Sequence, residues 1–267
     1  MSGIGYGSLP VHLDGASSPA ANGAYRYRGA FWGTRTIEHN TILAGWALAL
    51  LIGLPLLSHR DSRPVEARGG EAGFRRAIYV SIAISLSLVA GLTLAVATWQ
   101  RVDAGRLGWR VGSVPEALAW SLGTGAAGLA GLGLVTWGAH RMRLKEGRLA
   151  FLLMPRDAGE KRMFVVLAVL GAVCEEYVYR GFLLRMVTEW VASPGWAIVV
   201  TALSFGLAHG YQRAVGIVRA ALLGALLAVP VVWTGSLFPA VAAHFWINAA
   251  IGLGGWKLLA REQEETG

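Results

Sequence analysis

Residues 163–186, MFVVLAVLGAVCEEYVYRGFLLRM, place two adjacent carboxylates, Glu175 and Glu176, inside an apolar stretch of membrane-spanning length. Residues 163–174 carry no charge, and Arg180 follows Glu176 by four positions. A carboxylate at membrane depth costs about 3 kcal/mol or more, so two side by side predict a role or a partner. The other Asp and Glu residues lie in polar tails, in connecting loops or at segment ends.

The composition of the whole chain predicts a protein that crosses a membrane several times. Of its 267 residues, 54% are hydrophobic and 15% are charged, whereas soluble domains carry about 25% charged residues. Apolar segments that approach the roughly 20 residues needed to cross a bilayer lie at 41–57, 77–99, 117–137, 163–186, 196–209, 215–233 and 237–253. We therefore predict an all-α, polytopic transmembrane helix bundle with about seven spans, in a range of about six to eight.

The distribution of basic residues predicts an orientation. The net charge of +8 does not indicate nucleic-acid binding, because the basic residues cluster between apolar segments, as the positive-inside rule describes. The loops after the first and third segments are rich in them: Arg60, Arg63, Arg68, Arg75, Arg76, Arg141, Arg143, Lys145, Arg148, Arg156, Lys161 and Arg162. The loop after the second segment has only Arg101, Arg106 and Arg110. We expect the first two loops and the C-terminus in the cytoplasm and the N-terminal tail outside.

Two of the six histidines accompany the membrane carboxylates. His209 closes the segment 196–209, and His244 lies within 237–253, four residues before Asn248, so that His244 and Asn248 share a helix face. The other histidines lie in the tail, in loops or at a segment end. A lone buried histidine is usually a packing residue, but these two occur with the only membrane carboxylates, and we interpret them as functional.

The spacing within the acidic motif separates the two glutamates. Glu176 and Arg180 are four apart and can pair on one helix face, whereas Glu175 points about 100° away from Glu176. We interpret the Glu176–Arg180 pair as partly structural and Glu175 as freer to act on water, although either glutamate can be the base. Glu175 lies roughly 18 Å along its helix from the cytoplasmic end, so the site needs a water-accessible cavity.

These groups suit amide hydrolysis. The reaction needs a base for water, a proton for the leaving amine and donors for the oxyanion. An Asn side chain can only donate or accept hydrogen bonds, so Asn248 fits the oxyanion role or an orienting one.

Three motifs follow one another along the chain: Glu175-Glu176-x-x-x-Arg180, Phe205-x-x-x-His209 and His244-x-x-x-Asn248. Over about residues 160–250 the chain resembles the CAAX-protease and bacteriocin-processing family of intramembrane endopeptidases, which includes the type II CAAX prenyl endopeptidases. The resemblance implies an all-helical fold and hydrolysis of a peptide bond near the C-terminus or anchor of a membrane-associated protein or peptide.

The resemblance also implies roles for individual residues. Glu175 with His209 would activate the attacking water, His244 and Asn248 would stabilise the oxyanion, and Arg180 would support Glu176. Phe205 precedes His209 by one helical turn and is expected to pack beside it. On this basis we divide the chain into a polar tail (1–40), N-terminal transmembrane helices and loops (41–160), a catalytic transmembrane core (161–255) and a C-terminal tail (256–267).

A metal requirement is left open by the sequence. Glu175, His209 and His244 can supply three zinc ligands and leave a position for water, but the chain has no His-Glu-x-x-His motif. A mechanism without a cofactor uses the same residues, and we favour it slightly over zinc.

Other readings remain. Cys174 next to Glu175 is a rival nucleophile, although a membrane cysteine is more often a small packing residue. Buried Glu, His and Arg also serve proton-coupled transporters, and a non-catalytic membrane scaffold is a third class. The Ala-, Gly-, Leu- and Arg-rich composition favours a bacterial inner membrane, where the substrate would be a prenylated protein, a bacteriocin or pheromone leader, or a C-terminal sorting signal. Gly123, Ala127 and Gly131, spaced by four, are expected to pack inside the bundle.

Overall fold

The computed structural model describes residues 40–58, 72–144 and 153–255, and every regular element in these ranges is helical. The chain is an all-α membrane helix bundle. Nearly all of the expected N-terminal tail, the C-terminal tail and most of the first basic loop lie outside the described residues, and the proposed division into domains stays a prediction.

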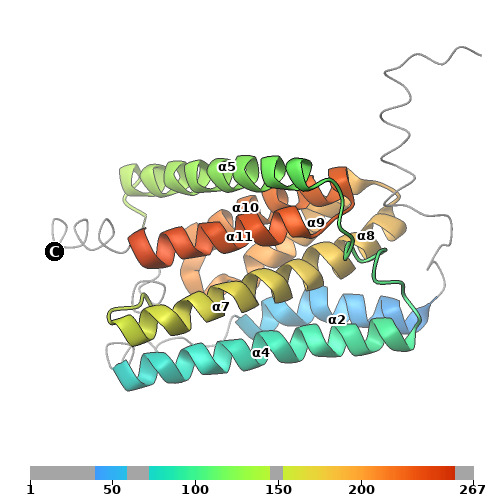
Figure 1. Ribbon diagram of the computed structural model, residues 1–267, viewed down its shortest axis with the longest axis horizontal. Helices are drawn as coiled ribbons and strands as arrows, with labels where there is room; N and C mark the ends of the chain where they lie inside the picture. Colours follow the sequence, from blue (N-terminus) through green and yellow to red (C-terminus); the bar gives the residue numbers. More distant parts are fainter. Residues whose placement is uncertain (1–39, 59–71, 145–152, 256–267) are drawn as a thin grey trace, which may run out of the picture.

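The helices run side by side along the long axis of the molecule (Figure 1). Their order is α2 (Thr41–Ser58), α4 (Ala72–Trp99), α5 (Val114–Arg141), α7 (Ala158–Glu176), the π-helix η1 (Tyr177–Leu183), α8 (Leu184–Val191), α9 (Pro194–Leu207), the 3₁₀ turn η2 (Gly210–Gln212), α10 (Arg213–Thr234), α11 (Phe238–Ala250) and the π-helix η3 (Ile251–Gly255). In Figure 1, α5 lies above α10 and α11, while α7 and α4 lie below them and α2 lies behind.

Four of the predicted spans coincide with helices that are long and apolar enough to cross a membrane. In the described part of the chain these are Thr41–Ser58, Gly73–Trp99, Val114–Arg141 and Gly210–Thr234, and Pro194–Leu207 and Phe238–Gly254 are shorter apolar helices. The predicted span at 163–186 falls in neither group, because α7 also carries charged residues in its first turns. The number of crossings therefore stays a prediction.

Hydrogen bonds at the two ends of the bundle show how successive helices alternate in direction. At one end, Ser58 Oγ donates to the Leu207 carbonyl over 2.8 Å and joins the ends of α2 and α9. At the opposite end, Asn40 Nδ2 donates to Gln100 Oε1 over 2.6 Å, and the Leu237 N–H donates to the Gly108 carbonyl over 2.9 Å. The site helix α7 starts at the first of these ends and runs toward the second (Figure 1).

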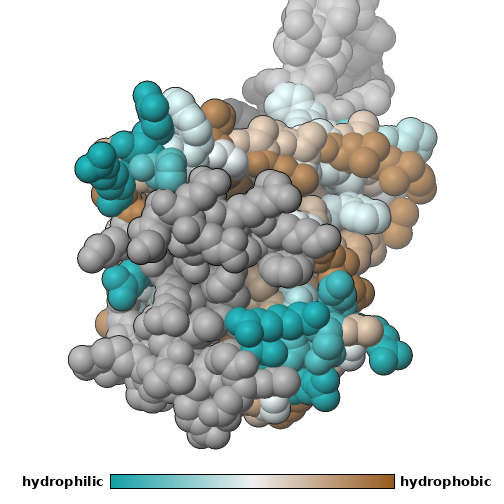
Figure 2. Space-filling model, turned by 90° about the vertical axis from the view of Figure 1, so that its left-hand side faces the viewer, coloured by the Kyte–Doolittle hydropathy of each residue, from teal (hydrophilic) through white to brown (hydrophobic). Residues whose placement is uncertain are grey.

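Surface polarity separates an end face from the flanks. Figure 2 shows the end at which α7 begins, where hydrophilic side chains gather in front of a hydrophobic flank. The tryptophans at segment ends are exposed, as interfacial aromatics are: Trp99, Trp137, Trp196 and Trp233. This distribution fits a bundle whose flanks face lipid and whose ends face water.

The acidic motif lies in the most buried stretch of the molecule. Every residue from 176 to 188 is buried, and η1 contributes Tyr177, Val178, Tyr179, Phe182 and Leu183 to the main hydrophobic core. The π-helix η1 is therefore central: α2, α4, α9 and α10 contact it, so that its polar groups must find partners within the protein.

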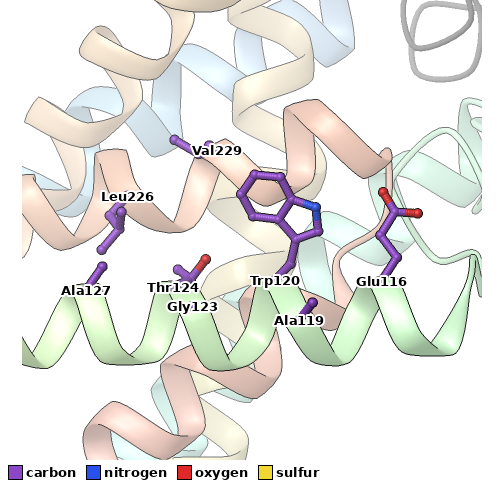
Figure 3. A pocket seen from close by; sticks show the side chains of 8 residues that line it. All are labelled: Glu116, Ala119, Trp120, Gly123, Thr124, Ala127, Leu226 and Val229. Carbon is purple, nitrogen blue, oxygen red and sulfur yellow. The ribbon is translucent and has the colours of Figure 1, made fainter. Parts of the chain in front are cut away.

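The small-residue stripe of α5 does not pack as predicted. Gly123 and Ala127 are exposed and line a hollow of about 440 Å³ between α5 and α10, which Figure 3 shows with Trp120 and Glu116 beside it. The close approach occurs instead at buried Gly128, where a Cβ atom would lie 2.5 Å from the Ile247 side chain of α11. The expectation that the stripe packs inside the bundle is wrong for Gly123 and Ala127.

Candidate active site

The helix that carries the acidic motif changes its winding at the motif itself. Glu175 and Glu176 are the last two residues of α7, and the π-helix η1 begins at Tyr177. The sequence predicted continuous α-helix here. Short π-helical stretches within α-helices often occur at functional sites, and this one places the Glu-Glu pair and Arg180 at a widened turn.

Glu176 is the most enclosed member of the site. Its side chain is 0% exposed, and its Oε1 accepts hydrogen bonds from Arg180 Nη1 over 2.9 Å and from His244 Nδ1 over 2.7 Å. Its Oε2 is buried and has no hydrogen-bond partner among the described residues. The predicted Glu176–Arg180 pair is present, and the sequence did not predict that His244 shares it.

Arg180 is held by three different groups. Besides Glu176, its Nη2 donates to the Gly224 carbonyl of α10 over 3.0 Å. Its guanidinium lies over the Phe205 ring, 4.5 Å from the centroid, which is a cation–π distance. Arg180 therefore fixes Glu176 and also joins η1 to α9 and α10. The Gly224 carbonyl is a site contact that no sequence signal marks.

His244 lies between the two glutamates. While its Nδ1 faces Glu176, its Nε2 is 3.8 Å from Glu175 Oε2. The His244 side chain is 4% exposed and that of Glu175 is 21% exposed. A carboxylate accepts hydrogen bonds, so Nδ1 carries the hydrogen toward Glu176 and Nε2 is the ring atom that faces Glu175.

The Phe205 ring packs against both imidazole rings, those of His209 and His244. Its ring centroid is 4.6 Å from that of His209 and 6.4 Å from that of His244, and Tyr179 packs edge-on against its other side at 4.9 Å. The prediction that Phe205 packs beside His209 is confirmed.

His209 lies just beyond the end of its helix. We expected it to close the segment 196–209, but α9 ends at Leu207 and His209 precedes the 3₁₀ turn η2. Its Nδ1 is 2.8 Å from the Phe205 carbonyl. A carbonyl only accepts hydrogen bonds, so here too Nε2 is the free ring nitrogen.

Asn248 lies one helical turn after His244 on α11 and is half-buried. Within the described part of the chain, its side-chain amide has no hydrogen bond. The two residues therefore follow each other along one face of the helix, as the spacing predicted.

The metal requirement stays a prediction. Within the described ranges, no group of three or more His, Cys, Asp and Glu side chains lies close enough to hold a metal ion, and Glu175, His209 and His244 form no such set. His244 Nδ1 is engaged by Glu176 and His209 Nδ1 by a carbonyl, which leaves the Nε2 atom of each ring. We route no step through a metal.

The sequence did not predict two further carboxylates that form ion pairs inside the bundle. Glu160 at the start of α7 is 0% exposed and pairs with Arg75 of α4 at 2.9 Å. Glu189 of α8 pairs with Arg185 at 2.8 Å. The four-residue spacing of Arg185 and Glu189 was a usable signal, but nothing local joins Arg75 to Glu160, which are 85 residues apart.

Comparison with known protein families addresses the same part of the chain. Residues 159–250 match the family described as type II CAAX prenyl endopeptidase Rce1-like. The matched residues contain all three motifs, so the resemblance drawn from them is confirmed. No curated protein and no solved structure gives a significant match.

Proposed function

We propose that this chain is an intramembrane endopeptidase that hydrolyses a peptide bond near the C-terminus or membrane anchor of a membrane-associated protein or peptide. The observation that carries the proposal is the contact of His244 with both Glu175 and Glu176, inside the segment that matches the Rce1-like family. A buried acid–base cluster of this kind suits the transfer of protons during amide hydrolysis.

Glu175 is the base in this mechanism. It is the more exposed of the two glutamates, and its side chain has no hydrogen bond among the described residues, so its oxygens are available to a water molecule. His209, with Nε2 free, orients that water together with Glu175. Glu176 is unsuited to this task, because its Oε1 is occupied and its Oε2 is sealed from solvent.

The oxyanion is stabilised from α11. The Asn248 amide donates a hydrogen bond to it. Preorganised donors of this kind typically contribute about 10²–10³-fold in rate each.

We place the site toward the cytoplasmic face of a bacterial inner membrane. At the end of the bundle near His209, α2 and α5 end and α4 and α7 begin (Figure 1), and these helix ends carry Arg75, Arg76, Arg141, Lys161 and Arg162. The positive-inside rule supports a cytoplasmic position for this end.

The test is a comparison of membrane proteomes from a wild-type strain and strains carrying Glu175→Gln or His209→Ala. We expect one or more membrane-associated precursors to remain uncleaved in both variants, with the variant proteins inserted and folded as in the wild type. Purified protein should cleave the same precursor with and without a chelator. Retained cleavage in a folded Glu175→Gln protein, or substrate flux into proteoliposomes without any cleavage, would contradict the proposal.

A further inference from the structure

The hydrogen bond from His244 to Glu176 restricts what His244 can do. Because Nδ1 donates to a carboxylate 2.7 Å away, a neutral His244 has a bare Nε2, which accepts a hydrogen and cannot donate one. His244 therefore cannot stabilise an oxyanion until its Nε2 receives a proton. The neighbour closest to supplying one is Glu175, whose Oε2 lies 3.8 Å from that atom.

The cluster of Glu175, Glu176, Arg180 and His244 can take up one proton and become neutral. Two carboxylates, Glu175 and Glu176, face one guanidinium, Arg180, so that with His244 neutral and both carboxylates ionised the cluster has one uncompensated negative charge. His209 forms no ion pair with either glutamate in the described structure, and its Nδ1 lies 2.8 Å from the Phe205 carbonyl. A single proton taken from water neutralises the cluster, and the position of Glu176 stabilises that proton on His244.

We propose that Glu176 is a positioning residue that makes His244 the proton carrier between Glu175 and the leaving amine. This inference rests on the proposed function and deepens it. Glu175 takes a proton from water as the water oxygen bonds to the carbonyl carbon. The proton passes to His244 Nε2, and the resulting imidazolium is held by Glu176. His244 then gives it to the amide nitrogen as the C–N bond breaks, which releases the amine and restores Glu175.

The closing experiment uses the precursor identified in the proteome comparison. A peptide that spans its cleaved bond is synthesised with either the natural amide or an ester at that bond. An alkoxide leaves with little help from a proton, whereas an amine does not leave without one. In Glu176→Gln, amide cleavage should fall roughly 100-fold, within the range for loss of acid–base catalysis, while ester cleavage falls far less.

Two variants serve as comparisons. Glu189→Gln removes a carboxylate that is 10% exposed and is also four residues from its Arg partner. Glu189 contacts no histidine in the described structure, so the ester-to-amide ratio should not change. Asn248→Ala should slow both substrates equally, because both pass through an oxyanion. Equal loss of the two activities in Glu176→Gln would overturn the proposal, since an oxyanion role or a structural role predicts that outcome.

A second measurement needs no substrate and separates this inference from the proposed function. In protein labelled with ¹⁵N at the histidine ring nitrogens, with His244→Ala for assignment, NMR should show a hydrogen on Nδ1 of His244 and none on Nε2. A hydrogen on Nε2 in the resting protein, with or without one on Nδ1, would overturn the proposal. If the wild type cleaves no precursor, the proposed function fails. The NMR measurement still decides whether Glu176 determines which ring nitrogen of His244 carries the hydrogen.

Discussion

Glu160 and Glu176 are both fully buried carboxylates on the same helix, α7, yet their surroundings differ. Both oxygens of Glu160 are occupied: Arg75 donates from Nε and Nη2 at 2.9–3.1 Å, and the Arg156 N–H donates over 2.8 Å. Glu176 has two donors on Oε1 and none on Oε2.

The hydrogen bond from His244, which Glu176 accepts and Glu160 does not, separates the two carboxylates. A buried ion pair with satisfied hydrogen bonds holds two elements together, here α4 and α7. A buried carboxylate with one oxygen unpartnered forgoes part of that stabilisation. Glu189 Oε2 also has no partner in the described structure, so the unpartnered oxygen alone does not mark a reactive carboxylate. Glu176 differs because it accepts a hydrogen bond from His244.

The largest expected contrast is in cleavage rate. Glu176→Ala removes the acceptor that holds the His244 ring, and cleavage should fall by about 10³-fold, within the range for a lost acid–base group. Glu160→Ala should leave the rate per folded molecule unchanged. The measurement is cleavage of the precursor by purified protein, normalised to the folded fraction. An equal loss of cleavage rate in both variants would contradict the proposal that Glu176, and not Glu160, takes part in the reaction.

Stability should show the opposite ranking. Glu160→Ala removes the carboxylate that accepts hydrogen bonds from the buried Arg75 guanidinium and from the Arg156 N–H, and loss of one member of a buried ion pair typically costs about 3–5 kcal/mol. Arg180 retains the Gly224 carbonyl and the Phe205 ring, so Glu176→Ala should reduce the free energy of unfolding by less. Unfolding in detergent micelles measures both, and Glu160→Gln, which keeps an acceptor, provides an intermediate control. If Glu160→Ala reduced the free energy of unfolding by less than about 1 kcal/mol, the value of an exposed ion pair, the prediction would be wrong.

Acid should weaken the Glu160 contact in a defined direction. Burial alone would raise the pKa of Glu160, but the hydrogen bonds from Arg75 and the Arg156 N–H, together with the charge of Arg75, hold that pKa below its ordinary value. A depressed carboxyl pKa contributes stability above the unfolded-state value of about 4.3. That contribution is lost as the pH falls through the folded-state pKa.

The corresponding measurement is the unfolding of wild type and Glu160→Gln as the pH is lowered from 6. The wild type should lose its advantage over the variant as the medium becomes more acidic. An advantage that stays constant down to the lowest accessible pH would show that Glu160 does not titrate with folding.

Sequence patterns predicted the helical class and the partners that are close along one helix. The first segment, expected at 41–57, is α2 at Thr41–Ser58, and the Glu176–Arg180 pair follows from four-residue spacing. Hydrophobic periodicity does not distinguish a π-helix from an α-helix over two turns, so η1 was not predicted. His209 lay outside its helix for a similar reason, since no Gly or Pro marks the end of α9 at Leu207.

The sequence alone did not predict contacts between segments that are far apart along the chain. Nothing near Glu176 indicates that His244, 68 residues later, donates to it, and nothing near Glu160 indicates Arg75. The motif suggested that the groups share a site, but only the packing of α11 against α7 shows which glutamate holds the histidine. The expectation that Glu176 is partly structural therefore covered its bond to Arg180 and missed its bond to His244.

The smallest expected effect concerns a third pair on α7 and its neighbour α4. Arg76 and Asp157 also form a 2.9 Å ion pair, but their side chains are 48% and 46% exposed. Exposed pairs typically contribute about 0–1 kcal/mol, so Arg76→Gln should change the free energy of unfolding by less than about 1 kcal/mol. Asp157 is left in place because it also caps α7 by accepting from the Glu160 N–H. The expected difference comes from the burial of Glu160 and from the hydrogen bonds to both of its oxygens. Equal destabilisation by Arg76→Gln and Glu160→Ala would contradict this explanation.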